Sequence, residues 1–180
     1  MDRRLGVSGG LFAMMMFLVQ ASEPPRYPCG DPKLVSQGYD GFRGIVRDIG
    51  DSVTIIVDLD EQPPWSDSMA VCSRKWCIVH LVNLLAPTDP TAAALGKRHL
   101  VDLCKGKRVW LSVSPVQDIP GILNALALTE SVSLNEAQLA AGFARYRSMG
   151  PYAVDWVTEC EWKRAEAQAR ESRVGLWRIN

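Results

Sequence analysis

Two consecutive segments separated by a tight turn place the strongest constraint on the fold of this chain. Residues 42–49 alternate roughly between apolar and polar side chains, and residues 52–59 are rich in β-branched side chains. Gly50-Asp51 lies between them and is typical of a turn. β-Branched residues pack well on a pleated surface, so the pattern predicts two strands in succession. The hydrophobic content of 47% supports a real core and argues against disorder.

Further elements follow these two strands. A loop is predicted over residues 60–68, and a third strand region over residues 69–85, where a turn between Cys72 and Cys77 interrupts it. Asp89-Pro90 begins a helix as N-cap and first-position proline, and Lys105-Gly106 ends it. Strands are predicted over residues 108–115 and 122–128, then a helix from the capping box Ser133–Glu136 to about Phe143, and a last helix over about residues 153–173. This order predicts an α+β fold, a five-stranded β-barrel of the OB type with three helices.

The N-terminus has the order of a secretory signal peptide. Met1–Arg4 is charged, residues 5–19 are apolar, and Val19-Gln-Ala21 supplies small residues at a cleavage spacing. The apolar run is shorter than the roughly 20 residues of a spanning helix. We predict a signal peptide over 1–21, an extended Pro- and Gly-rich lead-in over 22–40 and one domain over 41–180, in a secreted or periplasmic (extracytoplasmic) protein. The alternatives are an uncleaved N-terminal anchor, which would be the chain's one membrane contact, and a buried helix.

Five cysteines fit an oxidising destination. Cys72 and Cys77 flank a four-residue turn, so a hairpin there would bring them within bridging distance. Cys104 and Cys160 lie on apolar faces of two predicted helices and are the favoured second pair, which leaves Cys29 over. Other pairings stay open, and each cysteine could instead be a small buried hydrophobe. The C-x4-C spacing is a weak zinc signal, because no second ligand pair follows it.

The second half of the chain carries several segments in a characteristic order. They are Ile119-Pro-Gly-Ile122, residues 123–128, Ser133-Leu-Asn-Glu136 through Gly142-Phe-Ala144, and residues 165–168 through Gly175-Leu-Trp177. This series resembles the staphylococcal nuclease (thermonuclease) family, without a gap as far as Ala144. The resemblance covers about residues 42–177 and implies the barrel of that family, the SNase-like fold.

The resemblance also implies where the family's site would lie. The family binds calcium through two aspartates and a carbonyl, uses a glutamate as general base, and holds the phosphate with two arginines. Asp51 stands at one ligand position, in Gly-Asp-Ser-Val. The phosphate arginines correspond to His80 and Ile122, the second ligand aspartate to Leu85 and the base to Thr88. Asp51 is therefore the only retained ligand position, and the resemblance implies no catalytic residue and no metal.

Neighbouring polar residues offer little compensation at these positions. Asp89 is needed as an N-cap, and His80 is charged only below its ordinary pKa of about 6.5. Asp58 and Asp60 share one strand face, which is predicted to be the solvent face because Leu59 takes the core. Calcium requires 6–8 oxygen ligands. No cofactor is expected, and Ca²⁺ would apply only to an active nuclease with a rebuilt site.

Several residues outside this site are candidates for binding. Lys105, Lys107 and Arg108 form one basic patch, and Arg145-Tyr146-Arg147 interleaves base and aromatic as single-stranded nucleic acids favour. The favoured interpretation of both is nevertheless a solvated helix end, where cations suit the helix dipole. Trp65, after two prolines in the long second loop, suits a protein contact, or folds back over the barrel mouth.

The substituted family-site positions and the remaining basic and aromatic candidates together predict a binding protein and not an enzyme. Lys plus Arg and Asp plus Glu are both 20, so no global field attracts a polyanion. We therefore expect a catalytically degenerate, exported thermonuclease-like domain that acts as a binding or accessory module. A protein partner is favoured, with weak nucleic-acid binding as a further possibility. The alternatives are an active metal-dependent nuclease and a structural subunit of an envelope assembly.

Overall fold

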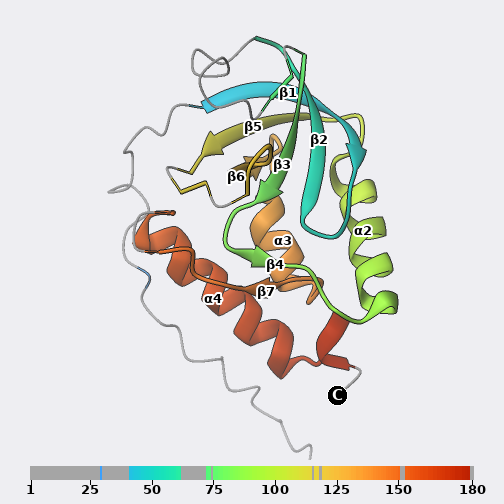
Figure 1. The fold of residues 1–180 in the computed structure, drawn as a ribbon. Helices are drawn as coiled ribbons and strands as arrows, with labels where there is room; N and C mark the ends of the chain where they lie inside the picture. Colours follow the sequence, from blue (N-terminus) through green and yellow to red (C-terminus); the bar gives the residue numbers. More distant parts are fainter. Residues whose placement is uncertain are drawn as a thin grey trace, which may run out of the picture.

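The computed structural model describes residue 29 and residues 41–61, 72–73, 75–114, 116–117, 119–150 and 153–178. Five strands close into a barrel in the order β1-β2-β3-β6-β5, with β5 pairing back to β1 (Figure 1). The barrel strands are β1 (Gly41–Ile49), β2 (Thr54–Leu59), β3 (Trp76–Leu81), β5 (Arg108–Val113) and β6 (Leu123–Leu128).

All barrel pairings are antiparallel except one. β3 and β6 run parallel, with Val79 opposite Leu123. Counting barrel strands alone, the order is 1-2-3-5-4, and the helix α2 (Pro90–Cys104) separates the third from the fourth. The predicted α+β class and the closed five-stranded barrel are therefore confirmed, and the described part also carries the three predicted helices.

Side-chain oxygens cap the first turn of each helix. The Asp89 carboxylate accepts from the N–H of Ala92 at 2.7 Å at the start of α2, as predicted. Ser133 accepts from the N–H of Glu136 at 3.3 Å and begins α3 (Leu134–Ala140). The last helix, α4 (Trp156–Glu171), begins later than predicted, because Asp155 is its N-cap. Each cap satisfies a backbone donor that the helix itself leaves unpaired.

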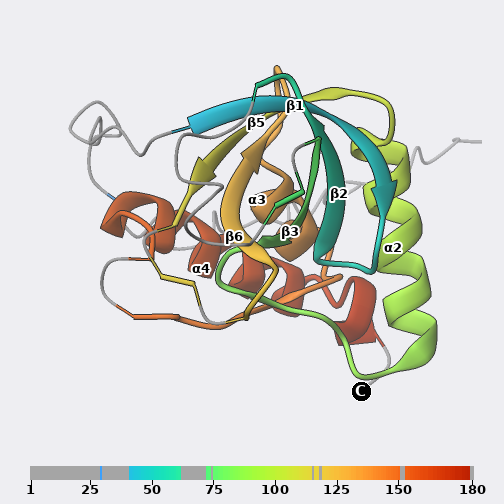
Figure 2. The same cartoon turned by 45° about the horizontal axis from the view of Figure 1, so that its top comes forward.

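A small second sheet joins the barrel to the C-terminal helices. β4 (Leu84–Leu85) pairs antiparallel with β7 (Arg145–Tyr146), and a 3₁₀ helix, η2 (Gly175–Arg178), follows α4. Asn83 precedes β4 in a left-handed conformation, with φ 61°, and its side-chain oxygen accepts from the N–H of Met149 at 3.1 Å. Figures 1 and 2 show α2 and α4 on different sides of the barrel.

The barrel interior is filled by the alternate residues of each strand. Val46, Ile55, Val57 and Leu111 are fully buried, while their strand neighbours face outward. The core continues beneath the helices through Leu100, Cys104, Leu134, Leu139, Trp162 and Ala165. One continuous core therefore supports both the barrel and the helical layer.

Replacing Gly142 with alanine is expected to lower the free energy of unfolding by about 2–3 kcal/mol. Gly142 has φ 68°, and a Cβ there would meet the Val174 carbonyl, whose carbon lies 3.0 Å away. This close approach lets Leu176 donate its N–H to the Gly142 carbonyl at 2.8 Å. Gly106→Ala is the control, because Gly106 has φ 76° but a Cβ added there would have nothing within 4 Å. Urea unfolding of both variants should show a smaller loss for Gly106→Ala, about 1 kcal/mol. Equal losses would contradict the role of the contact.

Candidate functional site

Asp51, the residue that the resemblance assigns to a metal ligand, stabilises the β1–β2 turn. Its Oδ1 accepts from the N–H of Val53 at 2.8 Å, and the residue is exposed. An aspartate that bonds a backbone N–H two residues ahead stabilises a turn. The carboxylate therefore has a structural task, whatever else it binds.

His80 lies at the end of β3, close to this turn. The register sets it opposite Thr54, three residues after Asp51, while Val79 beside it pairs with Leu123. Asp51, His80 and Ile122 thus come from neighbouring strand ends. His80 is half-buried and donates from Nε2 to the Leu84 carbonyl at 3.0 Å. This hydrogen bond holds the ring against the start of β4.

The other family-site positions carry no ligand or fixed charge. Leu85 is 38% exposed in β4, and Thr88 is exposed immediately before the α2 N-cap. Ile122 is half-buried and donates its N–H to Ile119 at 3.2 Å across a turn. Among the described residues, no group of three or more His, Cys, Asp or Glu could hold a metal ion.

The predicted basic–aromatic segment at β7 is occupied by contacts within the protein. The Tyr146 hydroxyl donates to Glu159 at 2.7 Å, and Lys163 lies 5.3 Å from the centre of the Tyr146 ring. Burial and the bond to Glu159 raise the pKa of Tyr146, while the hydrogen bond from Lys163 lowers the pKa of Glu159. Tyr146 thus joins β7 to α4, and its ring is not offered to a base.

The arginines that flank Tyr146 are both exposed. The Arg145 guanidinium lies 5.2 Å from the centre of the Trp177 ring, which Arg170 also covers at 4.3 Å. Arg147 donates its backbone N–H to Asn83 at 2.8 Å. The Arg145–Trp177 contact favours a structural role for Arg145 over the predicted nucleic-acid contact.

The residues of the predicted basic patch, Lys105, Lys107 and Arg108, make different contacts. Lys105 donates to Asp48 at 2.9 Å, and this hydrogen bond lowers the pKa of Asp48. Arg108 pairs with Asp60 through Nη1. Lys107 is exposed and lines, with Arg108, a surface hollow of about 430 Å³. The structure therefore brings Lys107 and Arg108 to one concave surface and uses Lys105 elsewhere.

Two residues that sequence reasoning missed complete this surface. Arg43 on β1 and Trp110 on β5 are directly opposite in the register, and the Arg43 guanidinium lies 5.2 Å from the centre of the Trp110 ring. With Arg108 they line a second hollow of about 290 Å³. Both occupy outward positions of alternating strands, and that alternation is the signal that marks them as surface residues.

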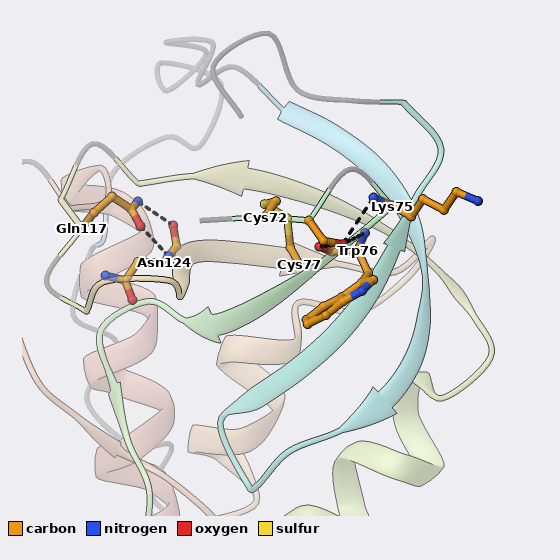
Figure 3. Close-up of a disulfide and its surroundings, with 7 residues drawn as sticks. Cys72, Lys75, Trp76, Cys77, Gln117 and Asn124 are labelled. Atoms are coloured by element: carbon orange, nitrogen blue, oxygen red, sulfur yellow. Dashed lines mark hydrogen bonds between the residues drawn. A yellow bond between two sulfur atoms is a disulfide. The ribbon is translucent and has the colours of Figure 1, made fainter. Parts of the chain in front are cut away.

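One of the two favoured disulfides is confirmed and the other is wrong. Cys72 and Cys77 are bonded across an antiparallel bridge, and the Ser73 hydroxyl accepts from the N–H of Trp76 at 3.1 Å in the turn (Figure 3). Cys160 is bonded not to Cys104 but to Cys29, the residue predicted to be left over.

Cys104 is a buried thiol in the stripe that α2 turns toward the barrel. It donates to the Leu100 carbonyl at 3.1 Å, and burial raises its pKa to about 12. The predicted pairing fails because α2 and α4 lie on different sides of the barrel, and Cys160 on α4 meets Cys29 instead, with 5.5 Å between their Cα atoms (Figures 1 and 2).

The two disulfides fit an oxidising compartment. The predicted signal peptide, the lead-in other than Cys29, and Trp65 lie outside the described residues. Within the described ranges, no helix combines the length and apolar character needed to cross a bilayer.

Comparison with known proteins gave no match, either among models of protein families or among curated proteins.

Proposed function

We propose that this chain is a catalytically degenerate thermonuclease-like domain that is exported and serves as a binding or accessory module. The observation that carries the proposal is the hydrogen bond by which the Asp51 carboxylate stabilises its own turn. This bond closes the β1–β2 turn, and the four other family-site positions carry His80, Leu85, Thr88 and Ile122. Phosphodiester hydrolysis in this family needs a metal, a base and fixed positive charge, and His80, Leu85, Thr88 and Ile122 include no carboxylate, lysine or arginine.

A protein partner is favoured over a nucleic acid. Much of the positive charge at the candidate surfaces is balanced within the fold, in the pairs Lys105–Asp48, Arg108–Asp60 and Arg47–Asp58. A polyanion is attracted by a net field, which such pairs cancel. A zwitterionic surface with exposed arginine and tryptophan suits protein recognition better. Weak nucleic-acid binding is the second candidate, supported by the exposed Lys107 and Trp110.

We expect the oxidised protein to cleave neither plasmid nor single-stranded DNA above background, with calcium or with EDTA. Asp51→Asn and Asp51→Ala separate the two possible roles of the carboxylate. An asparagine oxygen still accepts from Val53, so Asp51→Asn should retain stability, while Asp51→Ala should lose about 1 kcal/mol. Agarose-gel assays and urea unfolding measure the two effects.

EDTA-sensitive cleavage that both Asp51 variants abolish would overturn the proposal. It would instead establish the alternative, an active nuclease with a rebuilt site. The third reading, a structural subunit of an envelope assembly, predicts no cleavage but a stable complex in the native compartment.

A further inference from the structure

A row of four side chains crosses the outward face of the barrel on neighbouring strands. Ile45 on β1 is in register with Asp58 on β2 and with Arg108 on β5. Asp58 is in turn opposite Trp76 on β3. A buried residue adjoins each of the four along its strand, so these side chains point outward. Figures 1 and 2 show β1 across the top of the barrel, away from α4.

The centre of this face is apolar and exposed. Ile45 is 42% exposed, although β1 has a strand on each side of it. Trp110 on β5 is 38% exposed and lies diagonally from Ile45, because its partner in the register is Arg43. An exposed apolar centre with a polar rim is typical of a surface that contacts another protein.

Opposite charges flank Ile45 at equal distances. Because Asp58 and Arg108 are both in register with Ile45, each lies one strand spacing, about 4.8 Å, to one side of it. A two-fold rotation about the direction of β1 exchanges the two sides. It therefore places Ile45 of one copy on Ile45 of the other, and Asp58 of each copy on Arg108 of the other. An interface between identical surfaces requires this self-complementarity.

The ion pairs that these charges already make fit the same arrangement. Arg47 Nη1 lies 3.3 Å from Asp58 Oδ1, and Arg108 pairs with Asp60. All four side chains stay between 33% and 54% exposed, and such pairs contribute little by themselves. Between two copies, each pair adjoins a pair of the other copy, which gives four charges of alternating sign in a line. Exclusion of water from the interface strengthens these attractions.

Both tryptophans of this face are held in place by arginines of β1. The Arg43 guanidinium lies 5.2 Å from the centre of the Trp110 ring. The Arg47 guanidinium lies 5.1 Å from the centre of the Trp76 ring. Side chains that are already fixed lose little entropy on association. Tryptophan and arginine are also the residues that most often dominate the energy of protein interfaces.

We propose that this face docks a second copy of the chain, in a dimer whose two-fold axis runs along β1 at Ile45. An arginine and an aspartate together span about 10 Å, the distance between packed sheets. The face is roughly 20 Å by 20 Å, less than the ~800 Å² per partner of a standard interface, so we expect a weak dimer with a Kd on the order of 10 µM. The inference deepens the proposed binding function by naming a partner, and it rests on that function.

Sedimentation equilibrium of the oxidised protein recovered from its native compartment tests the interface. Asp58→Arg and Arg108→Asp each bring like charges together at two places in the dimer, so each should raise Kd about tenfold or more. A mixture of the two variants has opposite charges at both places. It should therefore form a heterodimer with an affinity close to that of the wild type, which a misfolded variant could not do.

Matched controls reverse the same charges away from this face. Arg98→Asp and Asp102→Arg lie at exposed positions of α2 and should leave Kd unchanged, alone and mixed. Every variant is first shown to unfold cooperatively. If a charge reversal prevents folding, Asp58→Asn and Arg108→Gln decide the outcome, and each should raise Kd by about threefold.

A wild type that stays monomeric well above the expected Kd overturns the proposal. It is equally overturned if the mixture of Asp58→Arg and Arg108→Asp associates no better than either variant alone, or if the α2 controls raise Kd as much. These failures are distinguishable from failure of the proposed function. A monomer that cleaves no DNA would contradict this interface alone, while calcium-dependent cleavage by a dimer would contradict the loss of catalysis alone.

Discussion

Cys160→Ser is expected to lower the free energy of unfolding by about 4–5 kcal/mol, the largest loss from any single side chain outside the core. The Cys29–Cys160 disulfide joins residues 131 apart, so it restricts nearly the whole domain in the unfolded state. The chain-entropy relation assigns about 5 kcal/mol to a loop of that length, and about 2 kcal/mol to the five-residue separation of Cys72 and Cys77. Cys29 is 7% exposed, so its sulfur is also removed from water.

Guanidinium unfolding of Cys160→Ser, Cys29→Ser and the double variant measures this effect. All three should lose the same stability, because either substitution removes the same bond. Cys72→Ser is the control with a short loop and should lose about half as much or less. In excess reductant the differences between wild type and the Cys160→Ser variant should nearly disappear. A Cys104–Cys160 peptide in a non-reducing map, or additive losses in the double variant, would contradict the assignment.

Local signals predict the parts of the fold that local chemistry decides. The strand pair around Gly50-Asp51 and the caps at Asp89 and Ser133 each depend on a few consecutive residues, and all three are present. The start of α4 is predicted too early, because the apolar spacing from Ala153 already fits a helix, although Asp155 is an ordinary N-cap. Arg173 follows the end of α4 in a left-handed conformation, with φ 51°. The sequence does not predict this, because arginine rarely adopts that conformation.

Long-range pairing could not be predicted in the same way. β4 and β7 have two residues each, too few to show a period, yet their pairing connects Leu85 with Arg145. The pairing of Cys29 with Cys160 was not predictable, because no sequence pattern around Cys29 indicates which helix it contacts. The outer surface of the barrel around Trp110 shows the same division. Lys107 and Arg108 stand out as a basic run, but Arg43 and Leu128 join Trp110 only through the register of three strands.

Trp162→Ala is expected to lower the free energy of unfolding by about 3–5 kcal/mol. Trp162 is 1% exposed on α4 and packs in the core with Ala153, Val154 and Ala165. Its removal loses a large buried apolar surface and leaves a cavity that the surrounding barrel and helices can fill only in part. The loss should appear as a lower denaturation midpoint with an unchanged denaturant slope.

Trp156→Ala is the matched control, because the same helix carries this tryptophan 60% exposed. A surface substitution of this kind changes stability by about 0.5 kcal/mol or less. Both variants are compared with the disulfides intact, since Cys160 lies on the same helix, and Trp162→Phe should recover part of the loss by refilling the cavity. If Trp156→Ala cost as much as Trp162→Ala, the exposed indole would have to be covered in solution. The exposed face of α4 around Trp156 would then be a binding surface. Sedimentation velocity would identify a second copy of the chain as the partner if the wild type is dimeric and Trp156→Ala is monomeric.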